Sequence, residues 1–255
     1  MTIRKPVVAA NWKMNGSRQL ADNLLQQIQE SGVDKQLQVV ISPPATLYSY
    51  IDEKIIQNKL EIILAAQNIN ELDKGALTGE ISAHLAKESG CKWVICGHSE
   101  RRSLFNESSI TTAEKFVKAQ SVGLKPILCV GETTEEYEKG KTFSRLTAQI
   151  EAVLHIGGKT AFKDCIIAYE PIWAVGTGKP ASPELAQDVH RFIRGMISSV
   201  CPTTAKSVCI LYGGSVTPEN AASYFAQPDI DGGLIGGASL IPEKFIEICQ
   251  TALVN

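Results

Sequence analysis

Short apolar runs alternate with longer amphipathic segments along this chain, and the alternation repeats eight times. A short apolar run bounded by turn residues is typical of a buried strand, and apolar residues spaced by three or four are typical of a surface helix. The expected strands are Val7–Ala10, Gln38–Ser42, Ile62–Ala66, Trp93–Cys96, Pro126–Val130, Cys165–Ala168, Ser207–Tyr212 and Gly233–Ile235. Eight strand–helix units in 255 residues predict an α/β protein, a (β/α)8 or TIM barrel with eight parallel strands, each followed by a helix.

The expected helices lie between these runs. They cover approximately residues 17–30, 47–51, 82–89, 108–120, 134–155 with an interruption near Gly140, 182–200, 218–226 and 242–253. A doubly wound open sheet is the alternative, but eight regular units at this length favour closure. No linker or change of composition divides the chain, so we expect a single domain over residues 1–255.

The charge balance and the cysteines limit the classes of protein to consider. With 25 basic and 27 acidic residues the net charge is −2, and there is no basic patch of the kind that binds nucleic acid. No apolar run approaches the length that crosses a membrane, and no signal peptide is visible. The seven cysteines form no CxxC pair and several lie inside apolar runs, so we expect small core residues in a reducing compartment. We therefore expect a cytoplasmic protein without nucleic-acid or membrane partners.

Polar residues gather where the strands are expected to end. In a barrel of this kind the active site lies at the carboxyl ends of the strands, so residues far apart in sequence meet there. They are Asn11 and Lys13 after the first strand, His98 and Glu100 after the fourth, and Glu170 after the sixth. His98 is the only one of the four histidines that directly follows a predicted strand. The alternative for each is an ordinary solvated loop residue.

Glycines follow the last three strands. They are Gly176, Gly213–Gly214 before Ser215, and Gly236–Gly237. Backbone amides at such turns, with a short helix after them, bind an anion without any charged side chain. Plain turns are the alternative, but the position at the strand ends favours a phosphate site.

The segment after Glu170 has the composition of a lid. Pro171 keeps Glu170 out of helical geometry, and Gly176 and Gly178 permit backbone angles that other residues resist. The lid residues are Pro171, Ile172, Trp173, Ala174, Val175, Gly176, Thr177, Gly178 and Lys179. A Walker nucleotide loop is excluded because Trp173 stands where that motif needs glycine. A loop with fixed ends and an apolar middle beside one acid predicts a lid over a general base.

These groups together indicate one reaction class. One acid, one histidine, one lysine, a phosphate cradle and a lid suit proton abstraction next to a carbonyl in a small phosphorylated substrate. No cluster has metal-ligand spacing and the reaction needs no redox group, so we expect neither metal nor cofactor. Another phosphate-binding barrel enzyme, such as an aldolase or an epimerase, and an inactive barrel that serves as a binding module are the alternatives.

Eight segments, in order along the whole chain, resemble the triosephosphate isomerase family. They are Asn11–Gly16, Ala66–Asn68, Gly79–Glu80, Gly97–Arg102, Cys129–Glu132, Ala168–Lys179, Tyr212–Val216 and Gly236–Leu240. The resemblance implies an aldose–ketose isomerase that interconverts dihydroxyacetone phosphate and D-glyceraldehyde 3-phosphate in glycolysis and gluconeogenesis. Two departures stand out, Ala10 in place of the usual glycine and Leu77 in place of a frequent phenylalanine.

The resemblance also implies roles for single residues. Glu170 is expected to be the base and His98 a neutral electrophile. Lys13, helped by Asn11, is expected to supply positive charge, and Glu100 is expected to orient Lys13 or to relay protons. Phosphate is expected on the backbone amides of four residues, Gly176, Ser215, Gly236 and Gly237. The long polar loop from Gln67 to Glu80 is expected to dock into a second subunit of a homodimer, with Thr78 beside the partner's site.

Overall fold

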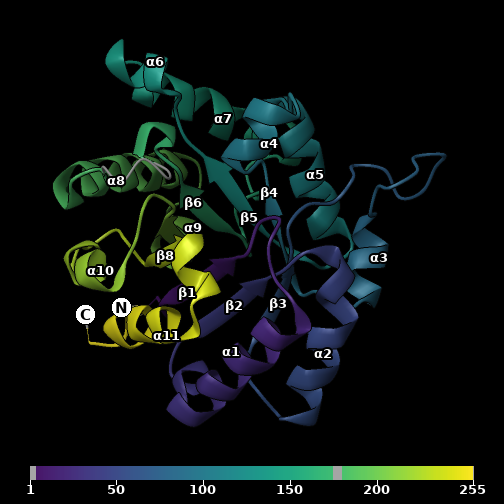
Figure 1. The fold of residues 1–255 in the computed structure, drawn as a ribbon. Coiled ribbons are helices and arrows are strands. Elements are labelled where there is room, and N and C mark those ends of the chain that lie inside the picture. The colour runs from purple at the N-terminus through teal and green to yellow at the C-terminus, as the bar shows by residue number, and fades with distance from the viewer. Residues whose placement is uncertain (1–3, 175–179, 255) are drawn as a thin grey trace.

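Eight parallel strands close into a barrel in chain order, and helices surround it (Figure 1). The computed structural model describes residues 4–174 and 180–254. The strands are β1 (Val7–Asn11), β2 (Gln38–Ser42), β3 (Ile63–Ala66), β4 (Trp93–Cys96), β5 (Lys125–Val130), β6 (Ile166–Tyr169), β7 (Cys209–Tyr212) and β8 (Gly232–Ile235). Because β1 pairs with both β2 and β8, the sheet has no edge. The predicted (β/α)8 barrel is confirmed.

Helices of varied length connect the strands. They are α1 (Arg18–Ser31), α2 (Tyr48–Gln57), α3 (Ala83–Glu88), α4 (Ser99–Leu104), α5 (Ser109–Ser121), α6 (Thr134–Glu138), α7 (Thr142–Gly157), α8 (Pro183–Val200), α9 (Pro202–Ser207), α10 (Pro218–Phe225) and α11 (Pro242–Thr251). Single 3-10 turns are η1 (Val33–Lys35), η2 (Ala45–Leu47), η3 (Ile172–Ala174) and η4 (Gly237–Leu240). The sequence did not predict α4 or α9. Because Pro202 starts α9, which ends at Ser207, the seventh strand begins at Cys209 rather than at Ser207.

Serine caps begin four of the helices. The hydroxyl oxygens of Ser17, Ser82, Ser108 and Ser182 each accept a hydrogen bond from the backbone N–H three residues later. Such a cap satisfies one of the donors that a helix start leaves free. α1 ends at Gly32, whose φ of 65° lies in the left-handed region that favours glycine. These local signals explain why the predicted helix starts lie within one residue of those observed.

The core has two layers separated by the sheet. Because side chains alternate along a strand, Val7 and Ala9 of β1 point into the barrel, whereas Val8 and Ala10 pack under the helices. Ala10 is fully buried in this outer layer, so the departure from the family's usual glycine lies outside the barrel interior. A close-packed interior on both faces holds the strand ends as a rigid rim.

Two peripheral features lie apart from the core. Residues 72–80, between β3 and α3, are exposed and extend away from the barrel, and the two ends of the chain lie close together beside α11 (Figure 1). Arg4 and Ala252 line one small cavity at the end of the barrel where the strands begin. Across the described ranges, no helix combines the length and apolar character needed to cross a membrane.

Candidate active site

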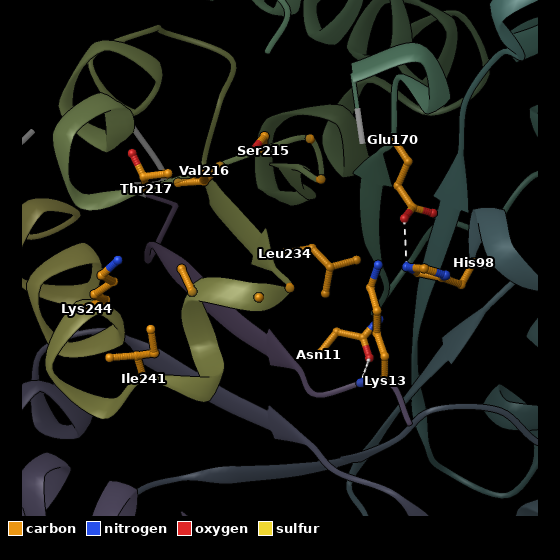
Figure 2. Close-up of a pocket in the computed structure, with 15 residues that line it drawn as sticks. Asn11, Lys13, His98, Glu170, Ser215, Val216, Thr217, Leu234, Ile241 and Lys244 are labelled. Carbon is orange, nitrogen blue, oxygen red and sulfur yellow. Dashed lines mark hydrogen bonds and ion pairs between the residues drawn. The ribbon is translucent and has the colours of Figure 1, made fainter. Parts of the chain in front are cut away.

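A cavity of about 330 Å³ opens at the carboxyl ends of the strands (Figure 2). Its size is at the lower end of the range for small-molecule sites. It is lined by Asn11, Lys13, His98, Glu170, Gly213, Gly214, Ser215, Val216, Thr217, Leu234, Gly236, Gly237, Ala238, Ile241 and Lys244. Seven of the predicted site residues line this cavity: Asn11, Lys13, His98, Glu170, Ser215, Gly236 and Gly237. Glu100, which contacts Lys13, Thr78, on the loop between β3 and α3, and the lid residues 171–174 do not line it. Gly176 and the lid residues 175–179 lie outside the described residues.

Glu170 follows β6 and is only 2% exposed. Its carboxylate accepts hydrogen bonds from the backbone N–H of Ser99 at 3.0 Å and from the Ser99 hydroxyl at 3.2 Å. The second partner is His98, whose Nε2 lies 2.9 Å from Oε1. Burial raises the pKa of the Glu170 carboxyl, but the charge and hydrogen bonds of His98 and Ser99 lower it more, so the pKa lies below the usual value. The carboxylate is therefore buried and ionised.

His98 caps the N-terminus of α4. Its Nδ1 accepts the backbone N–H of Glu100 at 3.3 Å, so in the neutral ring the proton is on Nε2, facing Glu170. Burial lowers the pKa of the imidazole, but the Glu170 carboxylate raises it more, and the net shift is upward. This upward shift depends on the contact with Glu170. Burial and the helix N-terminus favour the uncharged ring, whereas the Glu100 carboxylate, 3.6 Å from Nδ1, also raises the pKa of His98.

Lys13 is held in an unusual backbone conformation. Its φ of 53° is in the left-handed region, which costs a non-glycine residue about 1–2 kcal/mol. The conformation is supported on both sides, since the Asn11 Oδ1 accepts the Lys13 N–H at 3.1 Å and the Gln67 Nε2 donates to the Lys13 carbonyl at 2.8 Å. The Lys13 Nζ lies 2.7 Å from the Glu100 Oε1. The ammonium is thereby placed at the cavity wall (Figure 2).

Close approach to Glu170 requires glycine at position 213, whereas Gly236 is in ordinary van der Waals range of Lys13. A Cβ on Gly213 would lie 2.8 Å from the Glu170 Cγ, so any side chain there displaces the carboxylate. A Cβ on Gly236 would lie 3.5 Å from the Lys13 Cε, which places the lysine stem against the turn after β8. That turn is fixed because both N–H and hydroxyl of Ser239 bond to the Gly236 carbonyl, at 2.9 and 2.6 Å. Gly237 and Ala238, at the start of η4, line a cavity that also holds a lysine.

The sequence model of the family described as triosephosphate isomerase matches residues 6–252. The chain belongs to the triosephosphate isomerase family. It is an isomerase, because curated proteins named triosephosphate isomerase resemble it over nearly their whole length. Those of Shewanella halifaxensis, Shewanella pealeana and Shewanella loihica are each 48% identical to it, with 99% of this chain and 99% of each relative covered.

Membership of the triosephosphate isomerase family decides against the aldolase and epimerase interpretations. Within the described ranges, no three histidine, cysteine or acidic side chains are grouped so as to hold a metal ion. The cysteines are all free and six of the seven are buried. For Cys96, burial raises the thiol pKa to about 12, so this cysteine is an inert core residue.

Sequence reasoning missed several residues of the triosephosphate isomerase site. Ser99 makes two hydrogen bonds to the carboxylate, and Gln67 bridges the carbonyls of Lys13 and Ser42. Both lie inside segments that carried the family resemblance, but no spacing rule assigns them to these partners. Lys244, on the first turn of α11, adds a second ammonium to the cavity rim (Figure 2).

Proposed function

We propose that this triosephosphate isomerase family member interconverts dihydroxyacetone phosphate and D-glyceraldehyde 3-phosphate through an enediol(ate), as a single-domain chain in a cytoplasmic homodimer serving glycolysis and gluconeogenesis. One observation carries the proposal. The Glu170 carboxylate and the His98 Nε2 meet at 2.9 Å on one side of a cavity that Lys13 and the glycine turns after β7 and β8 also line. A base and a hydrogen-bond donor therefore lie beside a place for phosphate.

Glu170 is the base in this proposal. It removes a proton from the carbon next to the substrate carbonyl and returns it to the neighbouring carbon, so the carbonyl moves along the chain. Its ionised state in the resting site suits this task, because the carboxylate is ready to accept a proton. To reach the substrate it must leave Ser99, which costs two hydrogen bonds that the closing lid and the substrate replace.

His98 is the electrophile. Its Nε2–H, which donates to Glu170 in the resting site, is free to donate to the substrate oxygen once the carboxylate has turned away. The Glu100 N–H on Nδ1 keeps that tautomer in place. A neutral donor matches the proton affinity of an enediolate oxygen better than an imidazolium does, so proton transfer between the two substrate oxygens has a small barrier.

Lys13 supplies positive charge to the phosphate and to the developing oxyanion. Asn11 fixes the lysine backbone, and Glu100 orients its ammonium through the 2.7 Å ion pair. Phosphate binds the backbone amides at Ser215, Gly236, Gly237 and, from the lid, Gly176. A lid over residues 171–179 closes on this arrangement and excludes water, because an exposed enediolate phosphate eliminates phosphate.

The dimer proposal is supported by an exposed apolar surface beside the active site. Met14 is 96% exposed and Phe105 is 65% exposed, and both line a second cavity of about 350 Å³ that shares Lys13 with the active site. An apolar surface of this kind is costly to leave in water. The extended loop carries Leu77, which is 42% exposed, next to Thr78. We infer that this loop of one subunit fills the second cavity of the other and supports Lys13 there.

A coupled assay tests the function. The purified chain is supplied with D-glyceraldehyde 3-phosphate, and dihydroxyacetone phosphate is followed by its reduction. Run in D₂O, the same reaction tests the base. A proton held on Glu170 exchanges with solvent deuterium, whereas a hydride shift within the substrate brings no solvent deuterium into the product. Turnover with solvent deuterium in the product is the expected result. No turnover would refute the function, and turnover without deuterium would refute the role of Glu170.

A further inference from the structure

A buried glutamine on α7 holds the backbone of the residue that follows β5. The side chain of Gln149 is only 4% exposed and lies between the buried Leu146 and Ile150 on the inner face of the helix. An amide among apolar neighbours is costly unless its polar atoms are hydrogen-bonded. The Gln149 Oε1 accepts the Gly131 N–H at 2.9 Å, and its Nε2 donates to the Gly131 carbonyl at 2.9 Å. One side chain therefore holds both polar backbone atoms of one residue.

Gly131 in turn lies against the backbone of Glu170. A Cβ at position 131 would lie 1.9 Å from the Glu170 carbonyl oxygen, so only glycine fits there without moving the acid. Directly before this contact, the Val130 carbonyl accepts the Glu170 N–H at 2.8 Å. The backbone of Glu170 therefore rests on the end of β5, at the residue that Gln149 holds.

The position of this backbone decides where the carboxylate lies. β6 runs between β5 and β7, and the residues that directly follow these two neighbours are Gly131 and Gly213. Gly131 touches the Glu170 carbonyl, whereas a Cβ on Gly213 would lie 2.8 Å from the Glu170 Cγ. The acid is thus confined from both sides, and a shift of its backbone is passed on to the carboxylate.

We propose that Gln149 is a positioning residue for Glu170 and acts through Gly131. The inference rests on the proposed role of Glu170 as the base. Without the amide, the buried N–H and carbonyl of Gly131 lose their partners, so this residue shifts and the Glu170 backbone shifts with it. A displacement of about 1 Å can cost about 10²-fold in rate. The turns proposed for phosphate follow β7 and β8, so substrate binding should change little.

The test compares Gln149→Met, which keeps the bulk of the side chain and removes both hydrogen bonds, with Gln187→Met as a matched control. Gln187 of α8 is 8% exposed; its Oε1 accepts the Asp229 N–H at 3.0 Å and its Nε2 donates to the Asp229 carboxylate at 2.7 Å. Asp229 lies before β8, at the end of the barrel opposite the active site. The measurements are kcat and KM in the coupled assay, binding of glycerol 3-phosphate, which has no carbonyl, and thermal unfolding.

Both variants should unfold at a lower temperature than the wild type. Gln149→Met should lose about ten- to hundredfold in kcat, with KM and glycerol 3-phosphate binding within about twofold of the wild type, and Gln187→Met should keep its kcat. Retained kcat in Gln149→Met, equal losses in both variants, or a loss of binding as large as the loss of kcat would overturn the positioning role. A wild type that binds glycerol 3-phosphate without isomerising triose phosphates would instead refute the proposed function.

Gln149→Glu gives a second test that holds even if Gln149→Met does not fold. While protonated, the introduced carboxyl can accept the Gly131 N–H and donate to the Gly131 carbonyl, but once ionised it can only accept. Its kcat relative to the wild type should therefore fall as the pH rises through the pKa of that carboxyl. The new charge alone would have the opposite effect, because a nearby negative charge makes Glu170 a stronger base. A ratio that stays constant or rises with pH would contradict the positioning role.

Discussion

Replacing Glu170 with glutamine changes the charge of the site and almost nothing of its shape. The side chain is 2% exposed and receives hydrogen bonds from Ser99 N, Ser99 Oγ and His98 Nε2. The amide oxygen of the glutamine can still accept hydrogen bonds from one or two of these donors. The amide NH₂ group faces the remaining donor, so that hydrogen bond is lost. A buried polar group left without its hydrogen-bond partner lowers the free energy of unfolding by about 1–3 kcal/mol, which most folded proteins tolerate.

The effect on turnover is expected to be far larger than the effect on stability. An amide cannot accept the substrate proton, so the general-base contribution of about 10²–10⁴-fold is lost, equivalent to about 3–5 kcal/mol of transition-state stabilisation. Phosphate binding should change little, because the glycine turns and Lys13 line other parts of the cavity (Figure 2). The expected signature of Glu170→Gln is therefore a large loss of kcat with retained binding of 2-phosphoglycolate, a triose-sized phosphate whose carboxylate resembles an enediolate.

Glu170→Asp is the matched control. It keeps a carboxylate but withdraws it by one methylene, and a displacement of about 1 Å can cost about 10²-fold in rate. The coupled assay, analogue titration and thermal unfolding should be run on both variants. Glu170→Asp should be slower than wild type and faster than Glu170→Gln. If a folded Glu170→Gln variant kept more than about a tenth of wild-type turnover, proton transfer would have to be assigned to another group.

Three further outcomes are expected. Shortening residues 172–179 to a tight turn should keep the fold but release methylglyoxal and inorganic phosphate, and an unchanged product ratio would mean that the lid does not protect the intermediate. Thr78→Arg should bring a second cation to the partner subunit's Lys13, giving mainly monomer of very low activity by light scattering and the coupled assay; a fully active monomer would contradict this. Because Glu170 raises the pKa of His98 above its usual 6.5 in the resting site, kcat/KM should fall as pH drops through that raised pKa. The fall in kcat should come at lower pH, because Glu170 has turned to the bound substrate; identical profiles would argue against this coupling.

The architecture and the main site residues could be predicted from sequence for one physical reason. In a closed parallel barrel every strand ends at the same rim, so Asn11, His98 and Glu170 meet although long segments separate them. What stayed out of reach depends on side-chain packing between elements. Glycine-rich strand ends indicate a loop, but His98 caps a helix, α4, and this helix brings Ser99 to the carboxylate.

The ring stack between Tyr137 of α6 and Trp173 of η3, with centroids 4.1 Å apart, was equally hidden. Tyr137 lies in a short helical segment with no periodic signal, and its partner Trp173 belongs to a different strand–helix unit. A contact between two units has no signature within either one. Position along the rim can therefore be inferred from topology, whereas the orientation of a side chain at the rim requires the neighbouring units in place.

Closure of the barrel also bears on chain connectivity. β8 is joined to β1 by strand pairing, with Val7 opposite Gly232, and the covalent chain passes between every other neighbouring pair of strands. Arg4 and Ala252 lie along one cavity at the end of the barrel opposite the active site. A circular permutant that links these ends and reopens the chain at the exposed turn 158–160 should therefore keep wild-type turnover in the coupled assay, and a large loss would refute this. The eight units form a closed ring, and we expect catalysis not to depend on which connection between units holds the ends of the chain.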